Sequence, residues 1–192
     1  MPNTVETVEA MLGATWIGAA WTSTSPDFGI SGVLDRFKQS KPTILIGVDA
    51  IWYNDKVHDH YGKLSNVANQ LENLKACIVV PFVNSNYKLP ENSTFEIWNP
   101  DLEKLQNKTA PEYHMCNFND PLFVMYSSGT TGAPKCMVHS VGGTILEHAK
   151  EHILHLDMTN RDIMLYYTTT GWMMWNWLVG ALLAGSSIVT YG

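Results

Sequence analysis

The apolar positions of the chain recur in two patterns, and the first has helical spacing. Residues 5–21 are apolar almost all round, which predicts a buried helix that continues into a short strand. Apolar residues three and four positions apart predict further helices over residues 30–37 and 64–71. We expect two more helices over residues 143–156 and 172–184, the second of them apolar enough to lie in a core.

The second pattern is a continuous run of apolar, largely β-branched residues, which is typical of strands buried on both faces. Residues 43–48 and 77–81 show this pattern, and residues 122–126, 163–167 and 187–190 are further predicted strands. Strands and helices therefore alternate along the chain. Because alternation with short connections implies right-handed βαβ units, the sequence predicts an α/β fold of strand–helix layers with a largely parallel sheet.

One stretch interrupts this alternation. Residues 84–119 are rich in Asn, Pro and polar side chains and show no sustained period. We expect irregular surface structure there, with one short helical turn near residues 101–105. The chain starts close to a predicted helix and stops directly after a predicted strand, so we expect a part of a longer protein.

Charge and composition narrow the classes of partner. The formal net charge is -6 and Lys and Arg are not clustered, which argues against nucleic acid or an acidic membrane surface as a partner. The N-terminus lacks a secretory signal, and the most apolar stretch is shorter than the ~20 residues that span a bilayer. We predict a cytosolic protein with no membrane span. Irregular spacing of the cysteines favours reduced thiols over disulfides.

The strongest chemical signal lies in residues 126–135, where Ser, Thr and Gly residues and one Lys stand between a predicted strand and a following helical segment. Glycines let backbone N–H groups approach an anion, hydroxyls add donors, and a lysine adds positive charge. This composition is suited to surrounding phosphate oxygens. The expected phosphate-binding residues are Ser127, Ser128, Gly129, Thr130, Thr131, Gly132 and Lys135.

Two other interpretations of this loop are a polar surface turn and a Walker A loop. Clusters of Ser, Thr and Gly are common in turns, but here the whole run fits a phosphate loop and a strand precedes it. A Walker A loop requires Gly directly before the Lys and Ser or Thr directly after it. Pro134 and Cys136 occupy those two positions, which excludes that motif.

Residues 127–135 resemble the phosphate-loop signature of the adenylate-forming superfamily, which includes acyl-CoA synthetases, luciferases and peptide-synthetase adenylation domains. The flanking residues 120–122 and 138–140 are similar to this family as well. Many members have Gly after the Lys, whereas this chain has Cys136. The resemblance implies that Lys135 and Thr130 take part in catalysis by holding the β- and γ-phosphates as pyrophosphate leaves.

The same resemblance implies the domain organisation. Residues 1–192 would be part of an N-terminal AMP-binding (adenylation) domain, cut at both ends, and the family's mobile C-terminal domain would be absent. We therefore expect the isolated chain to bind nucleotide weakly and to turn over nothing.

A second block, residues 166–177, resembles the acetoacetate-activating branch of this superfamily, as do residues 23–29 and 33–37. The resemblance implies activation of acetoacetate by ATP with Mg²⁺, followed by transfer to CoA as co-substrate, so the partners would be small molecules. In the family this block lines the acyl pocket. The implied acid-binding residues are Gly171, Trp172, Met173 and Met174.

Other interpretations of these features stay open. The parent protein could activate another short acid, or the chain could be an inactive nucleotide-binding remnant. The aromatic block could also serve core packing, which is what we expect of Trp175 and Trp177.

Three histidines form a separate candidate. His148, His152 and His155 follow at helical spacing and should form a boundary stripe about 110° from the apolar face of their helix. We disfavour a zinc site, because no Cys or carboxylate is positioned to complete it. His139 could approach the phosphates or be structural. Cys136 could have a lowered thiol pKa beside the lysine, although an inert thiol is favoured.

Overall fold

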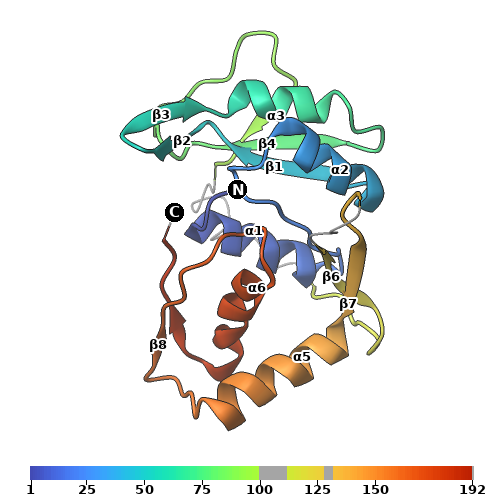
Figure 1. The fold of residues 1–192 in the computed structure, drawn as a ribbon, viewed down its shortest axis with the longest axis vertical. Helices are drawn as coiled ribbons and strands as arrows, with labels where there is room; N and C mark the ends of the chain where they lie inside the picture. Colours follow the sequence, from blue (N-terminus) through green and yellow to red (C-terminus); the bar gives the residue numbers. More distant parts are fainter. Residues whose placement is uncertain (100–111, 128–131, 192) are drawn as a thin grey trace. The chain divides into compact units, whose positions relative to one another are not determined.

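The computed structural model describes residues 1–99, 112–127 and 132–191, and Figure 1 shows their helices and strands coloured along the chain. The described residues fall into two compact units. The first unit holds Met1 and residues 26–99, and the second holds residues 2–25, 112–127 and 132–191.

A three-stranded parallel sheet forms the centre of the first unit. Its strands are β1 (Ile44–Val48), β4 (Ala76–Val80) and β5 (Glu96–Ile97), in the order β1-β4-β5. The two longer strands confirm those predicted from their β-branched runs. Strand β5 falls in the stretch that we expected to be irregular, and the expected turn near residues 101–105 lies outside the described residues.

Two helices pack against this sheet, α2 (Ile30–Ser40) and α3 (Tyr61–Ala68). Helix α2 buries Val33, Leu34 and Phe37, the apolar residues whose spacing predicted it. It ends at Lys41, which adopts a left-handed conformation with φ of 51°. Since Pro42 follows, the helix cannot continue.

The sequence did not predict the antiparallel hairpin of β2 (Ala50–Tyr53) and β3 (Lys56–Asp59). Its two turn residues, Asn54 and Asp55, have φ of 51° and 58°. Positive φ at both central residues matches the right-handed twist of paired strands, and Asn and Asp tolerate this conformation better than most residues. The Asn-Asp pair was therefore a readable hairpin signal.

The second unit is built from helices around a short hairpin. The N-terminal helix is α1 (Val5–Trp16), and the hairpin pairs β6 (Pro121–Tyr126) with β7 (Cys136–Ser140). Two helical segments follow directly, α5 (Val141–Ala149) and the π-helix η1 (Lys150–His155). The remaining elements are β8 (Ile163–Met164), α6 (Met173–Gly180), η2 (Ala181–Ala184) and β9 (Ser187–Ile188).

Helices α1 and α6 lie beside each other (Figure 1), and their core side chains meet those of β6. This core consists of Val8, Met11, Phe123, Trp175 and Val179. The indole of Trp175 is fully buried, and its Nε1–H donates to Asn3 Oδ1 at 2.8 Å. The prediction of a core helix near residues 172–184, with Trp175 inside, is confirmed.

Two predictions for this unit need correction. The helix predicted over residues 5–21 ends at Trp16, and its outer face is exposed, with Val5 at 58% and Leu12 at 44%. Trp21 instead pairs with Phe123 in a parallel bridge. The expected phosphate loop is followed by strand β7 and not directly by a helix. The residues after the loop pair with β6 in an antiparallel ladder, so they form a strand.

The α/β class is confirmed. Parallel pairing joins β1 to β4, β4 to β5, and β8 to β9. Antiparallel pairing occurs in the hairpins β2–β3 and β6–β7, which helix–strand alternation did not predict. In the described part of the chain the strands form several small sheets and no single large one.

A buried carboxylate holds the C-terminal end of β4 in the first unit. Asp49 is 2% exposed, and its oxygens accept hydrogen bonds from the backbone N–H groups of Phe82, Val83 and Asn84 at 2.7, 3.1 and 2.9 Å. Three donors satisfy a carboxylate that burial alone would strongly disfavour.

Replacing Asp49→Ala should lower the free energy of unfolding by about 3 kcal/mol, because three backbone donors lose a charged acceptor. Asp49→Asn keeps one acceptor oxygen and should lose less. The exposed Asp35→Ala is the matched control and should change stability by no more than about 0.5 kcal/mol. Urea unfolding followed by tryptophan fluorescence measures all three, and equal losses for Asp49→Ala and Asp35→Ala would contradict the capping role.

Candidate functional site

The phosphate loop is the connection of the β6–β7 hairpin, and its two ends are held together. Tyr126 pairs with Cys136 in the ladder. The N–H of Ser127 donates to the carbonyl oxygen of Lys135 at 3.0 Å, and the N–H of Lys135 donates to Ser127 Oγ at 3.4 Å. The candidate residues Ser127 and Lys135 are therefore neighbours at the base of the loop.

The other loop candidates are less completely described. Gly132 has φ of 155° and open space where a Cβ would stand, so it keeps the glycine-type backbone that the loop was expected to need. Ser128, Gly129, Thr130 and Thr131 lie outside the described residues.

Lys135 and Cys136 are both exposed at the start of β7. Partial burial raises the pKa of the Cys136 thiol above its usual value. A raised pKa leaves little reactive thiolate at neutral pH, which agrees with the inert thiol favoured from the sequence and not with an activated one. His139 is half-buried in β7, opposite Phe123.

The segments before and after the loop in sequence are joined by short polar contacts. Ser23 Oγ donates to the carbonyl oxygen of Thr170 at 2.6 Å. Thr170 Oγ1 in turn donates to the carbonyl oxygen of Thr24 at 3.1 Å. Ser23 and Thr24 therefore fix the backbone directly before Gly171, where the expected acid-binding block begins.

The expected acid-binding residues lie at the start of α6, where solvent reaches them. Trp172 is 60% exposed and Met173 is 49% exposed, whereas Met174 is half-buried. Trp172 is the residue before the first turn of α6, so its side chain is not part of the core. Trp177, expected in the core, is half-buried instead.

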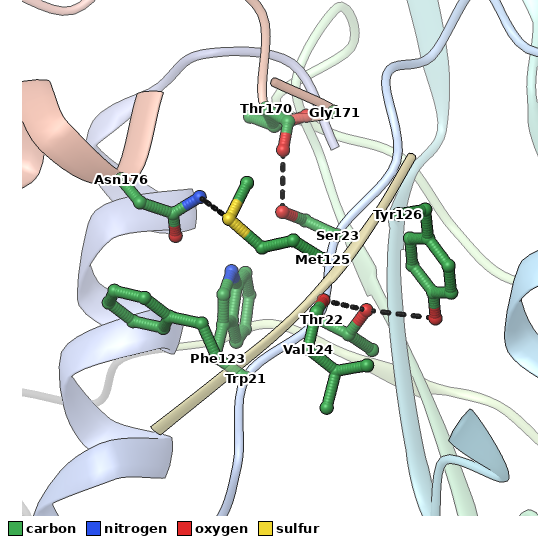
Figure 2. Close-up of a pocket in the computed structure, with 10 residues that line it drawn as sticks. All are labelled: Trp21, Thr22, Ser23, Phe123, Val124, Met125, Tyr126, Thr170, Gly171 and Asn176. Atoms are coloured by element: carbon green, nitrogen blue, oxygen red, sulfur yellow. Dashed lines mark hydrogen bonds between the residues drawn. The ribbon is translucent and has the colours of Figure 1, made fainter. Parts of the chain in front are cut away.

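A small cavity lies between β6, the strand-like segment at Trp21 and the start of α6 (Figure 2). Its volume is about 10 Å³, which matches one water molecule and is too small for a carboxylic acid substrate. Of the acid-binding candidates, Gly171 lines it. The full lining is Trp21, Thr22, Ser23, Phe123, Val124, Met125, Tyr126, Thr170, Gly171 and Asn176.

Sequence reasoning missed Trp21 and Asn176 as lining residues. Asn176 is the one polar side chain of α6, and it is 4% exposed. A buried amide in an apolar helix was the signal that could have pointed to this cavity.

The three histidines do not form the boundary stripe that helical spacing predicted. His152 is fully buried, its Nε2 lies 2.8 Å from the carbonyl oxygen of Trp177, and its ring packs on the Trp177 ring at a centroid distance of 4.6 Å. The helical segment turns the opposite way to the prediction: its apolar residues Ile145, Leu146 and Ile153 are 46%, 62% and 43% exposed, and the side that carries His152 faces inward, in α5 as well as in η1. Burial lowers the pKa of His148 to about 4, helped by His152 nearby.

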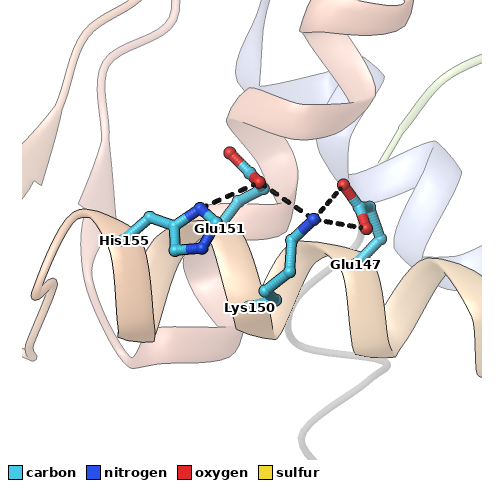
Figure 3. A network of polar contacts seen from close by, with 4 residues as sticks. All are labelled: Glu147, Lys150, Glu151 and His155. Carbon is cyan, nitrogen blue, oxygen red and sulfur yellow. Dashed lines mark hydrogen bonds and ion pairs between the residues drawn. The ribbon is translucent and has the colours of Figure 1, made fainter.

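His155 belongs instead to an exposed network of charges on the same helical segment (Figure 3). Lys150 Nζ lies 2.8 Å from Glu147 Oε1 and 3.2 Å from Glu151 Oε1, and Glu151 Oε1 also lies 3.2 Å from His155 Nδ1. The hydrogen bond that Lys150 donates to Glu151 lowers the pKa of Glu151, and the hydrogen bond that Lys150 donates to Glu147 raises the pKa of Lys150. Exposed pairs of this kind contribute little to stability.

Over residues 1–99, 112–127 and 132–191, no group of three or more His, Cys, Asp or Glu side chains is arranged to hold a metal ion. Within these same ranges, none of the helices combines the length and apolarity that crossing a membrane requires.

Comparison with known proteins defines the class. The family model described as "AMP-binding enzyme" matches residues 1–192, and the chain belongs to this family. The α/β arrangement described above agrees with this membership.

The relatives within the family carry a more specific name. The chain is 53% identical to the acetoacetyl-CoA synthetase of Gallus gallus, covering 100% of this chain and 29% of that protein. It is 40% identical to the acetoacetyl-coenzyme A synthetase of Rhizobium meliloti, again over 100% of this chain and 29% of the relative. The chain thus spans less than a third of the length of these relatives.

A solved structure agrees with these relatives. The acetoacetyl-CoA synthetase from Streptomyces lividans matches with a TM-score of 0.90 and 41% identity, over 100% of this chain and 28% of that chain.

Because His148 is partly buried, we expect the free energy of unfolding to depend on pH. Its pKa is lowered to about 4 in the folded protein, so the unfolded chain binds the proton first as pH falls. Stability contributed by neutral His148 is complete above about pH 6.5 and is lost between pH 6.5 and about pH 4. Wild type should lose roughly 2 kcal/mol more over this range than His148→Gln, a figure discounted for partial exposure.

Urea unfolding at pH 7 and at pH 4.5 measures this difference. Burial also lowers the pKa of His60 to about 4, so His60 titrates in the same range and only the difference between wild type and variant is informative. Parallel pH profiles for the two proteins would contradict the assignment.

Proposed function

We propose that the protein containing this chain activates acetoacetate with ATP and transfers the acyl group to CoA, and that residues 1–192 form part of its adenylation domain. The observation that carries this proposal is the 53% identity to the Gallus gallus acetoacetyl-CoA synthetase over the whole chain. The likeness to the Streptomyces lividans enzyme, with a TM-score of 0.90, supports it independently of the vertebrate sequences.

The proposed reaction has two steps. A carboxylate oxygen of acetoacetate attacks the α-phosphorus of ATP, the bond from that phosphorus to the bridging oxygen breaks, and pyrophosphate leaves. The sulfur of the CoA thiol then attacks the carbonyl carbon of acetoacetyl-AMP. AMP leaves with the bonding electron pair, and the thiol proton passes to the surrounding solvent.

The loop residues are assigned to the first step. Donors from Ser127, Ser128, Gly129, Thr130, Thr131 and Gly132 and the charge of Lys135 hold the β- and γ-phosphates, with Thr130 and Lys135 as the catalytic pair. Adenylyl transfer depends on positioning and charge stabilisation, so donors fixed before the substrate arrives are an advantage. The closed base of the loop, between Ser127 and Lys135, supports this assignment.

Magnesium fits the same loop. Mg²⁺ prefers oxygen ligands and is usually held by substrate phosphates with few protein ligands, which agrees with hydroxyl-rich surroundings. Ser127 Oγ accepts a long 3.4 Å hydrogen bond and has lone-pair capacity for such a ligand. The ion, bound to the phosphates, would neutralise charge on the departing pyrophosphate.

The acid is assigned to Gly171, Trp172, Met173 and Met174. The exposure of Trp172 and Met173 supports contact with a ligand, since neither side chain is committed to the core. A flat indole and flexible thioethers suit a small β-keto chain.

The proposed function is tested by the choice of acid. Full-length protein should support ATP–pyrophosphate exchange fastest with acetoacetate, more slowly with propionate, and least with acetate. Equal rates with all three acids would identify a general short-acid synthetase. No exchange with any of them, from a folded protein, would favour an inactive nucleotide-binding remnant.

Lys135→Ala should reduce acetoacetate-dependent exchange by about 10²–10³-fold, because the transition state loses a charged donor. Lys38→Ala removes an exposed lysine from α2 and is the matched control. If the exchange rate of Lys135→Ala equals that of Lys38→Ala, Lys135 is not part of the site.

Trp172→Ala and Trp175→Ala separate ligand contact from core packing on one helix. Trp172→Ala should raise KM for acetoacetate about tenfold while leaving the free energy of unfolding within about 1 kcal/mol of wild type. Trp175→Ala, which empties a fully buried site, should cost about 3–5 kcal/mol. The reverse pattern would mean that Trp172 is structural.

A further inference from the structure

The cavity beside α6 contains two polar atoms that the described protein leaves without partners. The indole Nε1–H of Trp21 is a buried donor, and Oδ1 of Asn176 is a buried acceptor. Both residues line the cavity (Figure 2), and the indole nitrogen faces the side where Met125 and Asn176 lie. Buried polar atoms without a hydrogen bond cost free energy, so native proteins rarely keep them.

The other side-chain polar groups around the cavity have partners. Thr22 Oγ1 donates to the carbonyl oxygen of Val124 at 2.8 Å and lies 3.1 Å from the Tyr126 hydroxyl. Ser23 and Thr170 donate to backbone carbonyl oxygens. The two unsatisfied atoms are thus one donor and one acceptor, which a single molecule can satisfy together.

The size of the cavity limits which molecule can contact both atoms. About 10 Å³ is the space of one water molecule, and a buried water needs two to four polar partners. Water accepts from an N–H and donates to an amide oxygen, so it matches both atoms. An organic ligand or a hydrated ion does not fit this volume.

We propose that this cavity binds one structural water molecule, which accepts from Trp21 Nε1–H and donates to Asn176 Oδ1. The water adds a polar link between two segments that otherwise meet through apolar contacts and the weak hydrogen bond from Asn176 to Met125. Trp21 is bonded by its backbone to Leu122 and Val124 of β6, and Asn176 belongs to α6. The bridge fixes the start of α6 relative to the strand that leads into the phosphate loop, and it does not rest on the proposed function.

The orientation of the Asn176 amide agrees with this arrangement. Its Nδ2 donates to Met125 Sδ at 3.7 Å, so the amide nitrogen faces the sulfur and the oxygen remains for the water. Sulfur is a weak acceptor and cannot hold the amide firmly. The water therefore supplies the stronger of the two contacts of this side chain.

A crystal structure of the intact protein tests the proposal directly. We expect one solvent peak within about 2.7–3.2 Å of both Trp21 Nε1 and Asn176 Oδ1. The absence of a peak, or a peak that contacts one of these atoms and not the other, would overturn the bridge.

A double-mutant cycle gives a second test in solution. Asn176→Leu and Trp21→Phe should each lower the folding equilibrium constant by roughly 5–30-fold, because each leaves the other atom unsatisfied. The double variant leaves neither atom unsatisfied. Its loss should therefore be well below the product of the two single losses.

The matched control for the cycle is Trp98. Its Nε1 is also buried without a partner, but Trp98 belongs to the first unit and does not line the cavity. Combining Trp98→Phe with Asn176→Leu should multiply the single effects to within about twofold. If the Trp21 pair multiplies in the same way, no shared water links Trp21 and Asn176.

Discussion

Antiparallel pairing of β6 with β7 is the interaction on which the candidate site depends. Each strand brings one end of the phosphate loop to the same place, and the Ser127–Lys135 backbone hydrogen bond closes it. On its other side, β6 is bridged to Trp21, and its Phe123 side chain is buried in the core of the second unit. The base of the loop is therefore held in place by that core. Donors positioned in this way need little reorganisation when a charged substrate binds.

The same core also fixes the block proposed to bind the acid. Trp175 is anchored by Asn3 from the N-terminal segment, and Thr170 is anchored by Ser23 and Thr24. Both anchors come from parts of the chain that precede the loop by about a hundred residues or more. These side-chain hydrogen bonds join residues that are far apart in the sequence, and they hold this block against the same core that supports the base of the loop. The positions of these candidate residues thus depend on long-range packing and not on the local motifs alone.

These long-range ties mark the limit of what sequence could predict. Helix α2 and strands β1 and β4 were predictable because their apolar spacing and the Lys41-Pro42 stop act locally. Strand β7 was missed because it is largely exposed and its pairing with β6 spans a loop. The burial of His152 was not foreseen either, because the prediction assumed that the apolar side of its helix faces the core, whereas Ile145 and Leu146 on that side are exposed. The chemistry of the loop was readable from residue types, whereas its hairpin geometry was not.

Helix α6 combines a buried side with an exposed start, and the exposed start is where we propose that the acid binds. Its buried side carries Trp175, Leu178 and Val179, which are at most 3% exposed, whereas Trp172 and Met173 at its start remain open to solvent. The cavity beside it is too small for an acid, so a substrate that reaches this block must contact it from the exposed side. That contact can discriminate between acids only if the helix start is held in place. A helix of eight residues has few contacts of its own to do this, which is why the Thr170 anchor and the bridged Asn176 matter to the geometry of the site.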